Sequence, residues 1–270
     1  MIADLNGVRV AYEDVGAGTP VVFIHGFPHD RTLWSRQIDV LSMHVRCIAP
    51  DLRNFGESSG DEPISLDQYA DDLAGLMSHL GIGRAVICGL SMGGYVAMNM
   101  WQRYSNRVLA MALCDTKCGA DSPEGKQKRD DLIALAKREG SVAVARNQIT
   151  GMLGKTTREN RPDVVATTTA MMERATVTAI VGAVTSIRDR PDSRATLATV
   201  TVPTVVLVGD EDVVTPLAEA QAIISALSPA AMARLEVIQG SGHATCLERP
   251  AAVTHVLADF LATLPTNGLS

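Results

Sequence analysis

The sequence predicts an α/β fold: a mostly parallel, doubly wound sheet with helices on both faces. Short apolar runs recur along the chain, and each ends in turn residues. Most of these runs are continuously apolar, which is the pattern of strands buried on both faces of a parallel sheet. Segments with helical periodicity lie between the runs, and strands that alternate with helices are typical of this architecture.

The apolar runs are the expected strands of the sheet, at residues 19–26, 45–51, 84–91, 108–116, 204–212 and 235–243. A further segment, residues 7–16, alternates polar and apolar positions. Alternation indicates a strand with one exposed face, so we expect an antiparallel hairpin at the edge of the sheet there.

The clearest expected helix covers residues 65–81. Ser65 and Gln68 have the spacing of a capping box, apolar positions repeat along one face, and Gly81 is placed to end the helix. The last expected helix begins near Pro250 and carries its apolar face to residue 264.

Strand-like runs are absent from the sequence between residues 117 and 201. Helical patterns fill this stretch instead, and the strand pattern returns after Pro203. We therefore expect an α/β core of residues 1–116 and 202–270, with a helical lid, residues 117–201, inserted after the sixth strand. The helices expected in the lid cover residues 123–140, 141–152, 162–174 and 176–189.

Composition and charge exclude several classes of protein. Of the 270 residues 46% are hydrophobic and the net charge is −6, so the chain can form a core and has no basic footprint for nucleic acid. The longest apolar run, Val108–Cys114, is far shorter than the roughly 18 residues that a membrane-spanning helix needs. The first residues lack the apolar stretch of a signal peptide. We expect a cytoplasmic protein without a nucleic-acid or membrane partner.

The cysteines predict neither disulfides nor a metal site. The chain has five, an odd number, scattered mostly inside apolar runs. Buried free thiols in a reducing compartment fit this distribution better than a disulfide framework. Cys114 and Cys118 are the only close pair, and no second pair or histidine lies near them in the sequence. We therefore expect no metal and no other cofactor.

One serine lies in a motif that carries chemistry. Residues 85–101 have the pattern of a strand, then Gly89-Leu90-Ser91-Met92-Gly93, then a helix. This is the G-x-S-x-G nucleophile elbow in the context that it requires. The glycines let strand and helix approach around a strained serine, and the helix start favours developing negative charge. Chance alone produces the motif in roughly one such chain in ten, so other residues must support it.

Supporting residues follow the serine in the required order. A serine hydroxyl needs a base to take its proton, and the base needs an acid to orient it. His243 comes after the last expected strand, on a loop, as the base should. The residues alone leave the acid open, because Asp210, Glu211 and Asp212 follow one strand and Asp115 follows another.

Five segments together carry a resemblance to a known family: HGFP (25–28), PDLRNFGES (50–58), GLSMGG (89–94), GDEDVVTP (209–216) and SGHATCLERP (241–250). With them the chain resembles the α/β-hydrolase fold superfamily over nearly its whole length. In that family the acid follows the pattern G-x-x-D-x-x-x-P, which implies Asp212 as the acid and a structural role for Asp210.

The resemblance also implies an oxyanion hole. In the family it is built from the backbone N–H of the residue after the nucleophile and one N–H from the loop after an early strand, here Met92 and Phe27. Such preorganised donors stabilise a developing oxyanion by roughly 3–4 kcal/mol each. His25 resembles the family's structural histidine, which braces this loop. Asn54 stands where the family more often has glycine, and asparagine tolerates the left-handed conformation. Arg53 beside it is expected to brace loops.

Residues 6–28, Trp34, 50–58 and 88–95 most resemble the carboxylesterase and 3-oxoadipate enol-lactonase branch. This resemblance implies a hydrolase for a small-molecule ester or lactone. The catalytic residues that it implies are Ser91, Asp212 and His243. The sequence does not decide the oligomeric state, and a homo-oligomer is compatible with it.

Other functions on the same fold stay open. A serine nucleophile argues against the haloalkane dehalogenase and epoxide hydrolase branches, which use aspartate there. Cofactor-free perhydrolases or haloperoxidases and C–C bond hydrolases keep the serine, and a non-catalytic ligand-binding protein is a third class.

Cys246 is expected to be a small buried residue, because no base is assigned to it. Flexible methionines in the lid favour a small or variable apolar acyl group, although most lid side chains are expected to be ordinary packing: Met152, Leu153, Met171, Met172 and Ile180.

Overall fold

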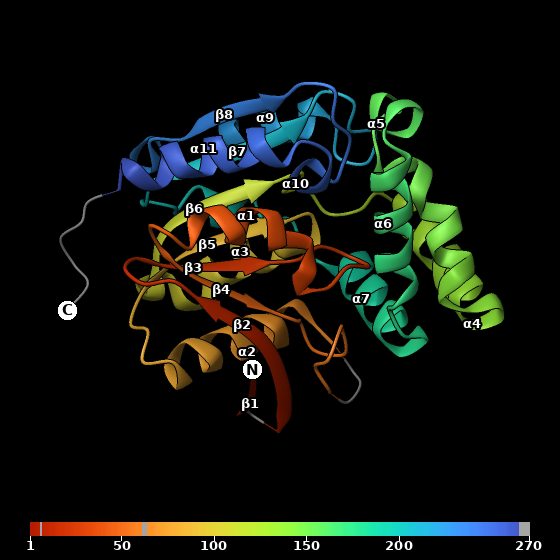
Figure 1. The fold of residues 1–270 in the computed structure, drawn as a ribbon, viewed down its shortest axis with the longest axis horizontal. Helices are drawn as coiled ribbons and strands as arrows, with labels where there is room; N and C mark the ends of the chain where they lie inside the picture. The colour runs from red at the N-terminus through yellow and green to blue at the C-terminus, as the bar shows by residue number, and fades with distance from the viewer. Residues whose placement is uncertain (6, 61–63, 265–270) are drawn as a thin grey trace.

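An eight-stranded sheet forms the centre of the molecule in the computed structural model (Figure 1), which describes residues 1–5, 7–60 and 64–264. Residues 6, 61–63 and 265–270 of the expected core lie outside this part. In space the strands follow the order β1-β2-β4-β3-β5-β6-β7-β8. Their bounds are β1 (Ile2–Leu5), β2 (Val8–Val15), β3 (Pro20–Ile24), β4 (Arg46–Pro50), β5 (Ala85–Leu90), β6 (Val108–Cys114), β7 (Thr204–Gly209) and β8 (Arg234–Ile238).

The sheet is parallel from β4 to β8, as predicted. Every residue of β3, β5 and β7 is buried, which explains why these runs are apolar without alternation. The predicted antiparallel hairpin is present at the edge of the sheet, but β1 and β2 form it together. Residues 8–15 form one strand, β2, which pairs antiparallel with β1 on one side and with β4 on the other. Alternation indicates only that one face of a strand is exposed. Both an inner antiparallel strand and an edge strand can have one exposed face, so the pattern does not tell them apart.

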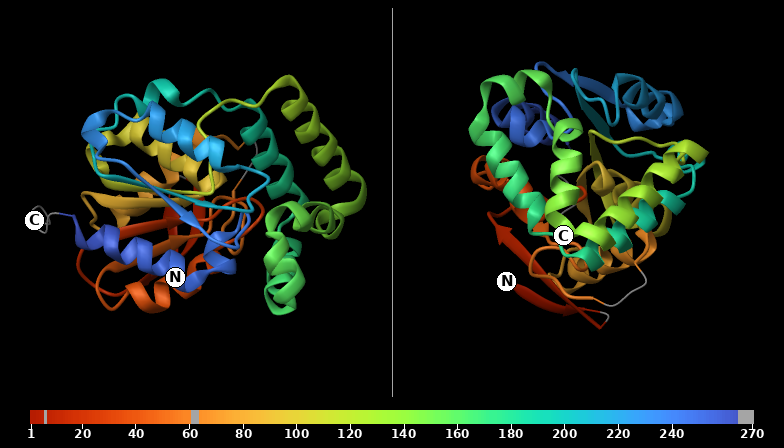
Figure 2. Two further views of the ribbon diagram at one scale, coloured as in Figure 1. Left: turned by 90° about the horizontal axis from the view of Figure 1, so that it is seen from above. Right: turned by 90° about the vertical axis from the view of Figure 1, so that its right-hand side faces the viewer.

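Helices cover both faces of the sheet (Figure 2). On one face lie α1 (Ser35–Leu41) and α11 (Pro250–Ala262), and on the other lie α2 (Leu66–His79), α3 (Met92–Tyr104) and α9 (Leu217–Ala226). Successive residues of a strand serve different faces. In β3, Val22 and Ile24 join the buried cluster under α2 and α3, whereas Val21 and Phe23 join the cluster under α1 and α11.

The helical stretch after the sixth strand is present as predicted. It contains α4 (Pro123–Met152), α5 (Lys155–Asn160), α6 (Pro162–Glu173), α7 (Val177–Asp189) and α8 (Arg194–Leu197). Helices α4 to α7 stand together at one end of the sheet, where the parallel strands point (Figures 1 and 2). Gly140, at φ 80°, breaks α4 into the two helices that the sequence predicts. Helices α5 and α8 were not predicted, because six and four residues are too few to show a helical period.

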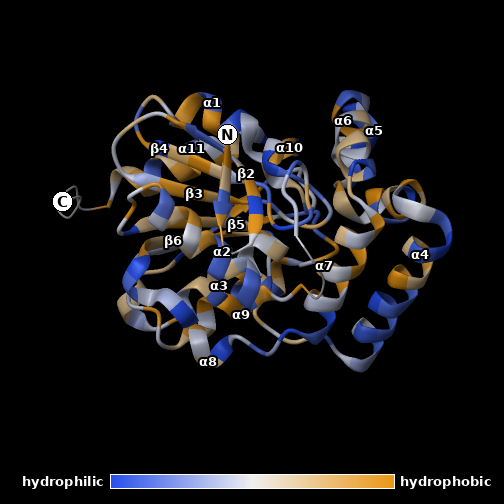
Figure 3. Cartoon of the chain, turned by 90° about the horizontal axis from the view of Figure 1, so that it is seen from below, coloured by the Kyte–Doolittle hydropathy of each residue, from blue (hydrophilic) through white to orange (hydrophobic). Residues whose placement is uncertain are grey.

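Hydropathy agrees with this arrangement. In Figure 3 the strands are largely hydrophobic, whereas α4 carries many hydrophilic residues.

Helix α2 begins after Ser65, whose Oγ accepts the N–H of Gln68, and Gly81 follows it at φ 67°, as the sequence predicts. Within the described residues, each helix is too short or too polar to span a bilayer.

Candidate active site

Ser91 lies on the turn between β5 and α3. Its backbone angles are φ 54° and ψ −113°, a strained conformation for a residue with a side chain. A Cβ on Gly89 would overlap the carbonyl of Gly93, and a Cβ on Gly93 would overlap the carbonyl of Ile24. Glycine is needed at both positions so that strand and helix can close around the serine. The turn leaves Ser91 half-buried at the carboxyl end of the sheet.

The three residues implied as catalytic lie in one hydrogen-bonded chain. His243 Nε2 is 2.8 Å from Ser91 Oγ, and His243 Nδ1 is 2.8 Å from Asp212 Oδ2. The side chains come from three separate loops, which follow β5, β7 and β8. His243 and Asp212 are almost completely buried, with exposed fractions of 1% and 4%. Since Asp212 is an acceptor, the proton of the neutral imidazole belongs on Nδ1, which leaves Nε2 free to accept from the serine.

Three further hydrogen bonds hold the Asp212 carboxylate in place. Its Oδ1 accepts the backbone N–H groups of Val214 and Thr215, and its Oδ2 accepts the hydroxyl of Thr215. Burial alone would raise the pKa of the Asp212 carboxyl, but His243 and the Thr215 donors hold that pKa below its usual value. The carboxylate is therefore ionised where His243 needs a counter-charge. Sequence reasoning did not find Thr215, because a threonine in a polar turn carries no signal.

The other candidate acids have different partners within the described residues. Asp210 accepts the N–H groups of Gly240 and Ser241, and Glu211 accepts the N–H and hydroxyl of Thr156. Asp115 is buried at the end of β6, where it accepts the N–H of Gly209 and the hydroxyl of Thr245. These three carboxylates tie loops together. Of the four acids, the structure joins Asp212 to His243.

The two backbone N–H groups expected in the oxyanion hole, those of Met92 and Phe27, have no recorded acceptor in the described residues. Met92 is the first residue of α3, so its N–H has no acceptor one turn earlier. No acceptor within the described part of the chain is recorded for the Phe27 N–H. The loop that carries Phe27 runs beside the serine, since a Cβ on Gly26 would lie 3.2 Å from Ser91 Cβ. Both N–H groups are thus available to a ligand oxygen.

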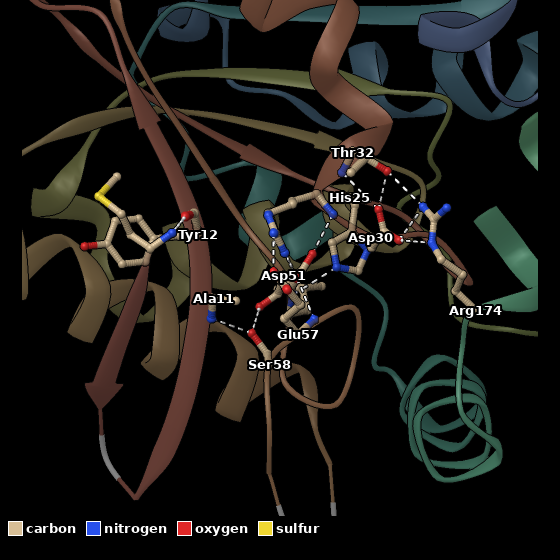
Figure 4. Close-up of polar contacts among 12 residues, drawn as sticks. Ala11, Tyr12, His25, Asp30, Thr32, Asp51, Glu57, Ser58 and Arg174 are labelled. Atoms are coloured by element: carbon tan, nitrogen blue, oxygen red, sulfur yellow. Dashed lines mark hydrogen bonds and ion pairs between the residues drawn. The ribbon is translucent and has the colours of Figure 1, made fainter.

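Buried polar contacts hold this loop in place (Figure 4). His25 Nδ1 donates to the Gly26 carbonyl, and its Nε2 accepts the N–H of Leu52, each at 3.0 Å. Burial lowers the pKa of His25, so the ring is neutral and acts as a brace. Asp30 accepts two hydrogen bonds from Arg174, which follows α6, at 2.9 and 2.7 Å. The helical stretch is therefore attached to the loop, a contact that the sequence did not predict.

The turn after β4 has the predicted conformation. Asn54 is at φ 69°, in the left-handed region where the family more often has glycine. Arg53 forms a bidentate ion pair with Asp72 of α2, at 2.9 and 2.8 Å. It braces the turn against α2.

His29 is a buried histidine that sequence reasoning did not single out. It is 1% exposed, and neither ring nitrogen has a hydrogen-bond partner in the described residues. Burial, together with nearby His25 and His243, lowers the pKa of His29 to about 3. The ring is therefore neutral, and it lies close to the base.

The described residues contain no group of three or more histidine, cysteine, aspartate or glutamate side chains that could hold a metal ion. All five cysteines are free and buried, as predicted. Cys246 is fully buried, and burial beside Asp115 raises the pKa of its thiol well above the usual value. The thiol packs in the core and is not a nucleophile at neutral pH.

Comparisons with known proteins identify relatives with the same fold. A structure of a thermophilic esterase from Thermogutta terrifontis is 36% identical, with a TM-score of 0.92 and 97% of each chain covered. The enol-lactonase from Burkholderia xenovorans LB400 is 28% identical, with a TM-score of 0.89, covering 97% of this chain and 100% of that one. A soluble epoxide hydrolase of Corynebacterium sp. is 37% identical over 114 residues, which are 41% of this chain and 38% of that protein. The family model described as the alpha/beta hydrolase fold matches residues 19–250, and the chain therefore belongs to that family.

Proposed function

We propose that this protein is a serine hydrolase that cleaves a carboxylic ester or a lactone through an acyl-enzyme intermediate. The observation that carries the proposal is the unbroken hydrogen-bonded chain from Ser91 through His243 to Asp212. The esterase and the enol-lactonase that match along nearly the whole chain support the same reaction class. The epoxide hydrolase matches less than half of the chain. Ser91 also argues against that chemistry, because the epoxide hydrolase branch uses an aspartate nucleophile.

In the proposed mechanism each group has its own step. His243 Nε2 takes the proton of Ser91 Oγ as the oxygen attacks the carbonyl carbon. The N–H groups of Phe27 and Met92 bind the oxyanion, and Asp212 stabilises the imidazolium that forms. His243 then gives the proton to the leaving alcohol as the C–O bond breaks. In a lactone this alcohol stays attached to the acyl chain. Water, activated by the same histidine, hydrolyses the acyl-enzyme.

Removing the nucleophile tests the proposal. Ser91→Ala should retain less than a few per cent of the turnover of p-nitrophenyl acetate, because no other group can form the acyl-enzyme. Asp212→Asn should lower kcat by about 1,000-fold or more, since it removes the charge that orients His243. Asp210→Asn and Asp115→Asn are the matched controls, with much smaller losses. Activity in Ser91→Ala, or equal losses in all three aspartate variants, would contradict the assignment.

The remaining alternatives are separated by direct assays. A fluorophosphonate probe should label Ser91 in the wild type, and failure to label would favour a ligand-binding protein. Assays with peroxide plus acetate, and with a 2-hydroxy-6-oxo dienoate, test the perhydrolase and C–C hydrolase alternatives. Under our proposal, ester and lactone turnover exceeds both.

A further inference from the structure

The helical stretch meets the His243 loop through two glycines in direct backbone contact. Gly154 precedes α5, and Gly242 immediately precedes His243. A Cβ on Gly154 would lie 2.7 Å from the backbone nitrogen of Gly242, and a Cβ on Gly242 would lie 2.7 Å from the carbonyl carbon of Leu153. Neither position has room for a side chain, so the two backbones touch.

Space, and not backbone conformation, requires glycine at this joint. Gly154 has φ −61° and ψ 156°, which any residue adopts. Gly242 is not among the residues with positive φ. The joint is therefore a close approach between the helical stretch and the loop of the base, and alanine would fit either backbone but not the gap.

A buried carboxylate bridges the two sides of the joint. Glu248 Oε1 accepts the N–H of Gly242, and its Oε2 accepts the N–H of Gly154, both at 2.8 Å. A third bond crosses the same joint, from the Ala244 N–H to the Met152 carbonyl at 3.1 Å. Glu248 is completely buried, and none of the ion pairs recorded in the described residues includes it. Burial raises the pKa of Glu248, and the backbone donors oppose that rise by replacing part of the water that the carboxyl group has lost.

We propose that Glu248 is a positioning residue for the catalytic base. Its two oxygens hold the peptide of Gly242 against residues 152–154, and this fixes the direction in which the next residue, His243, leaves the loop. His243 then reaches both Ser91 and Asp212 only while that segment of the helical stretch is docked. This inference rests on the proposed hydrolase function and adds that the helical stretch supports the base as well as covering the site.

Glu248→Gln is the sharpest test because it preserves shape. A carboxamide has one oxygen, so it can accept from Gly242 or from Gly154, and its NH2 must then face the other N–H. Because a small misplacement of a base is costly, we expect kcat for p-nitrophenyl acetate to fall about 10- to 100-fold. KM should stay within about threefold, since Glu248 contacts backbone and not substrate.

Thr156→Val is the matched control. It removes the hydroxyl that Thr156 donates to Glu211, another contact of the same segment, without touching Glu248 or the His243 loop. Its kcat should stay within about twofold of the wild-type value. Gly154→Ala tests the joint by a second route, because its Cβ forces the backbones apart, and it should lower kcat as Glu248→Gln does.

Labelling of Ser91 by a fluorophosphonate, followed to completion, separates positioning from loss of folded protein. We expect Glu248→Gln to reach the wild-type stoichiometry at a slower rate, with a cooperative thermal transition. If kcat per labelled site equals the wild-type value in both Glu248→Gln and Gly154→Ala, the positioning role is wrong. If wild-type Ser91 does not label, the proposed function itself fails, and the two failures are thus distinguishable.

Discussion

The His29 ring shows how a single residue can make stability depend on pH. A buried imidazole without a partner resists protonation, which is why its pKa falls to about 3 from the usual 6.5. The unfolded chain binds a proton below pH 6.5 and the folded chain does not. The contribution of neutral His29 to the unfolding free energy is therefore complete above pH 6.5. It falls by about 1.4 kcal/mol per pH unit as the pH drops from 6.5 towards 3.

His29→Leu should remove this pH dependence. We expect the variant to be more stable than the wild type, because two unpaired ring nitrogens are replaced by an apolar side chain. The gain should be larger at pH 5 than at pH 7.5, measured as thermal midpoints at both values. His255→Gln, at an exposed position on α11, is the control and should change neither midpoint. An equal gain at both pH values would show that His29 titrates normally.

At the scale of elements, an ion-pair cluster joins the two ends of the helical stretch. Asp121 lies just before α4, and Arg190 ends α7. Arg190 and Lys117 each approach the Asp121 carboxylate to 2.9 Å, and Arg129 approaches it to 3.1 Å. The Arg190 guanidinium also stacks 4.4 Å from the ring centroid of Tyr95 on α3. These contacts attach the helical stretch to α3, the helix that follows Ser91.

Asp121→Asn should weaken this ion-pair cluster and lower the stability of the protein. Removing the charge leaves a buried Arg190 without its counter-ion, and breaking such a pair costs about 3 kcal/mol. Burial would raise the pKa of Asp121, but Arg190 and Lys117 hold it well below the usual 3.8. Its contribution to stability is thus complete at pH 7, and it disappears as the pH falls through the lowered pKa.

Urea unfolding at pH 7 and at pH 4.5 measures how much unfolding free energy Asp121→Asn loses relative to the wild type. This loss should be similar at both pH values. Asp163→Asn, which breaks an exposed pair with Arg161, is the control and should change stability little. A loss that is confined to pH 7 would contradict a lowered pKa for Asp121.

At the scale of the whole molecule, part of the helical stretch packs against the loop that carries His243. Met152 and Leu153 are 4% and 2% exposed and pack in one buried cluster with Ala244, the residue after His243. Met171, Met172 and Ile180 are also buried in clusters with other side chains, so ordinary packing explains them, as the sequence analysis expected. A long acyl chain would have to displace this layer, and we therefore expect short acyl groups.

A series of p-nitrophenyl esters tests the acyl preference. We expect kcat/KM to be highest for short acyl chains and to fall as the chain lengthens. Ser91→Ala measured alongside corrects for background hydrolysis. A preference for C12 or longer would contradict the expectation.

Much of the fold and part of the site could be predicted, because their signals are local. Buried parallel strands must be apolar throughout, and the turn around Ser91 needs glycines at fixed positions, so both are visible in short stretches of sequence. The order of serine, acid and histidine follows from the order of the strands. The strand pairing of residues 8–15 could not be predicted, because alternation does not say which neighbours a strand has.

The residues that hold the site together are decided by contacts between distant segments. Which of Asp115, Asp210, Glu211 and Asp212 is the acid depends on which carboxylate contacts His243. The hydrogen bond between His243 and Asp212 joins residues 31 positions apart. Glu248 bridges Gly242 and Gly154, the latter 94 positions away, and its own segment does not show that it contacts Gly154. A short motif can require a local backbone shape, but only the packed sheet and helices bring separate loops within hydrogen-bond distance.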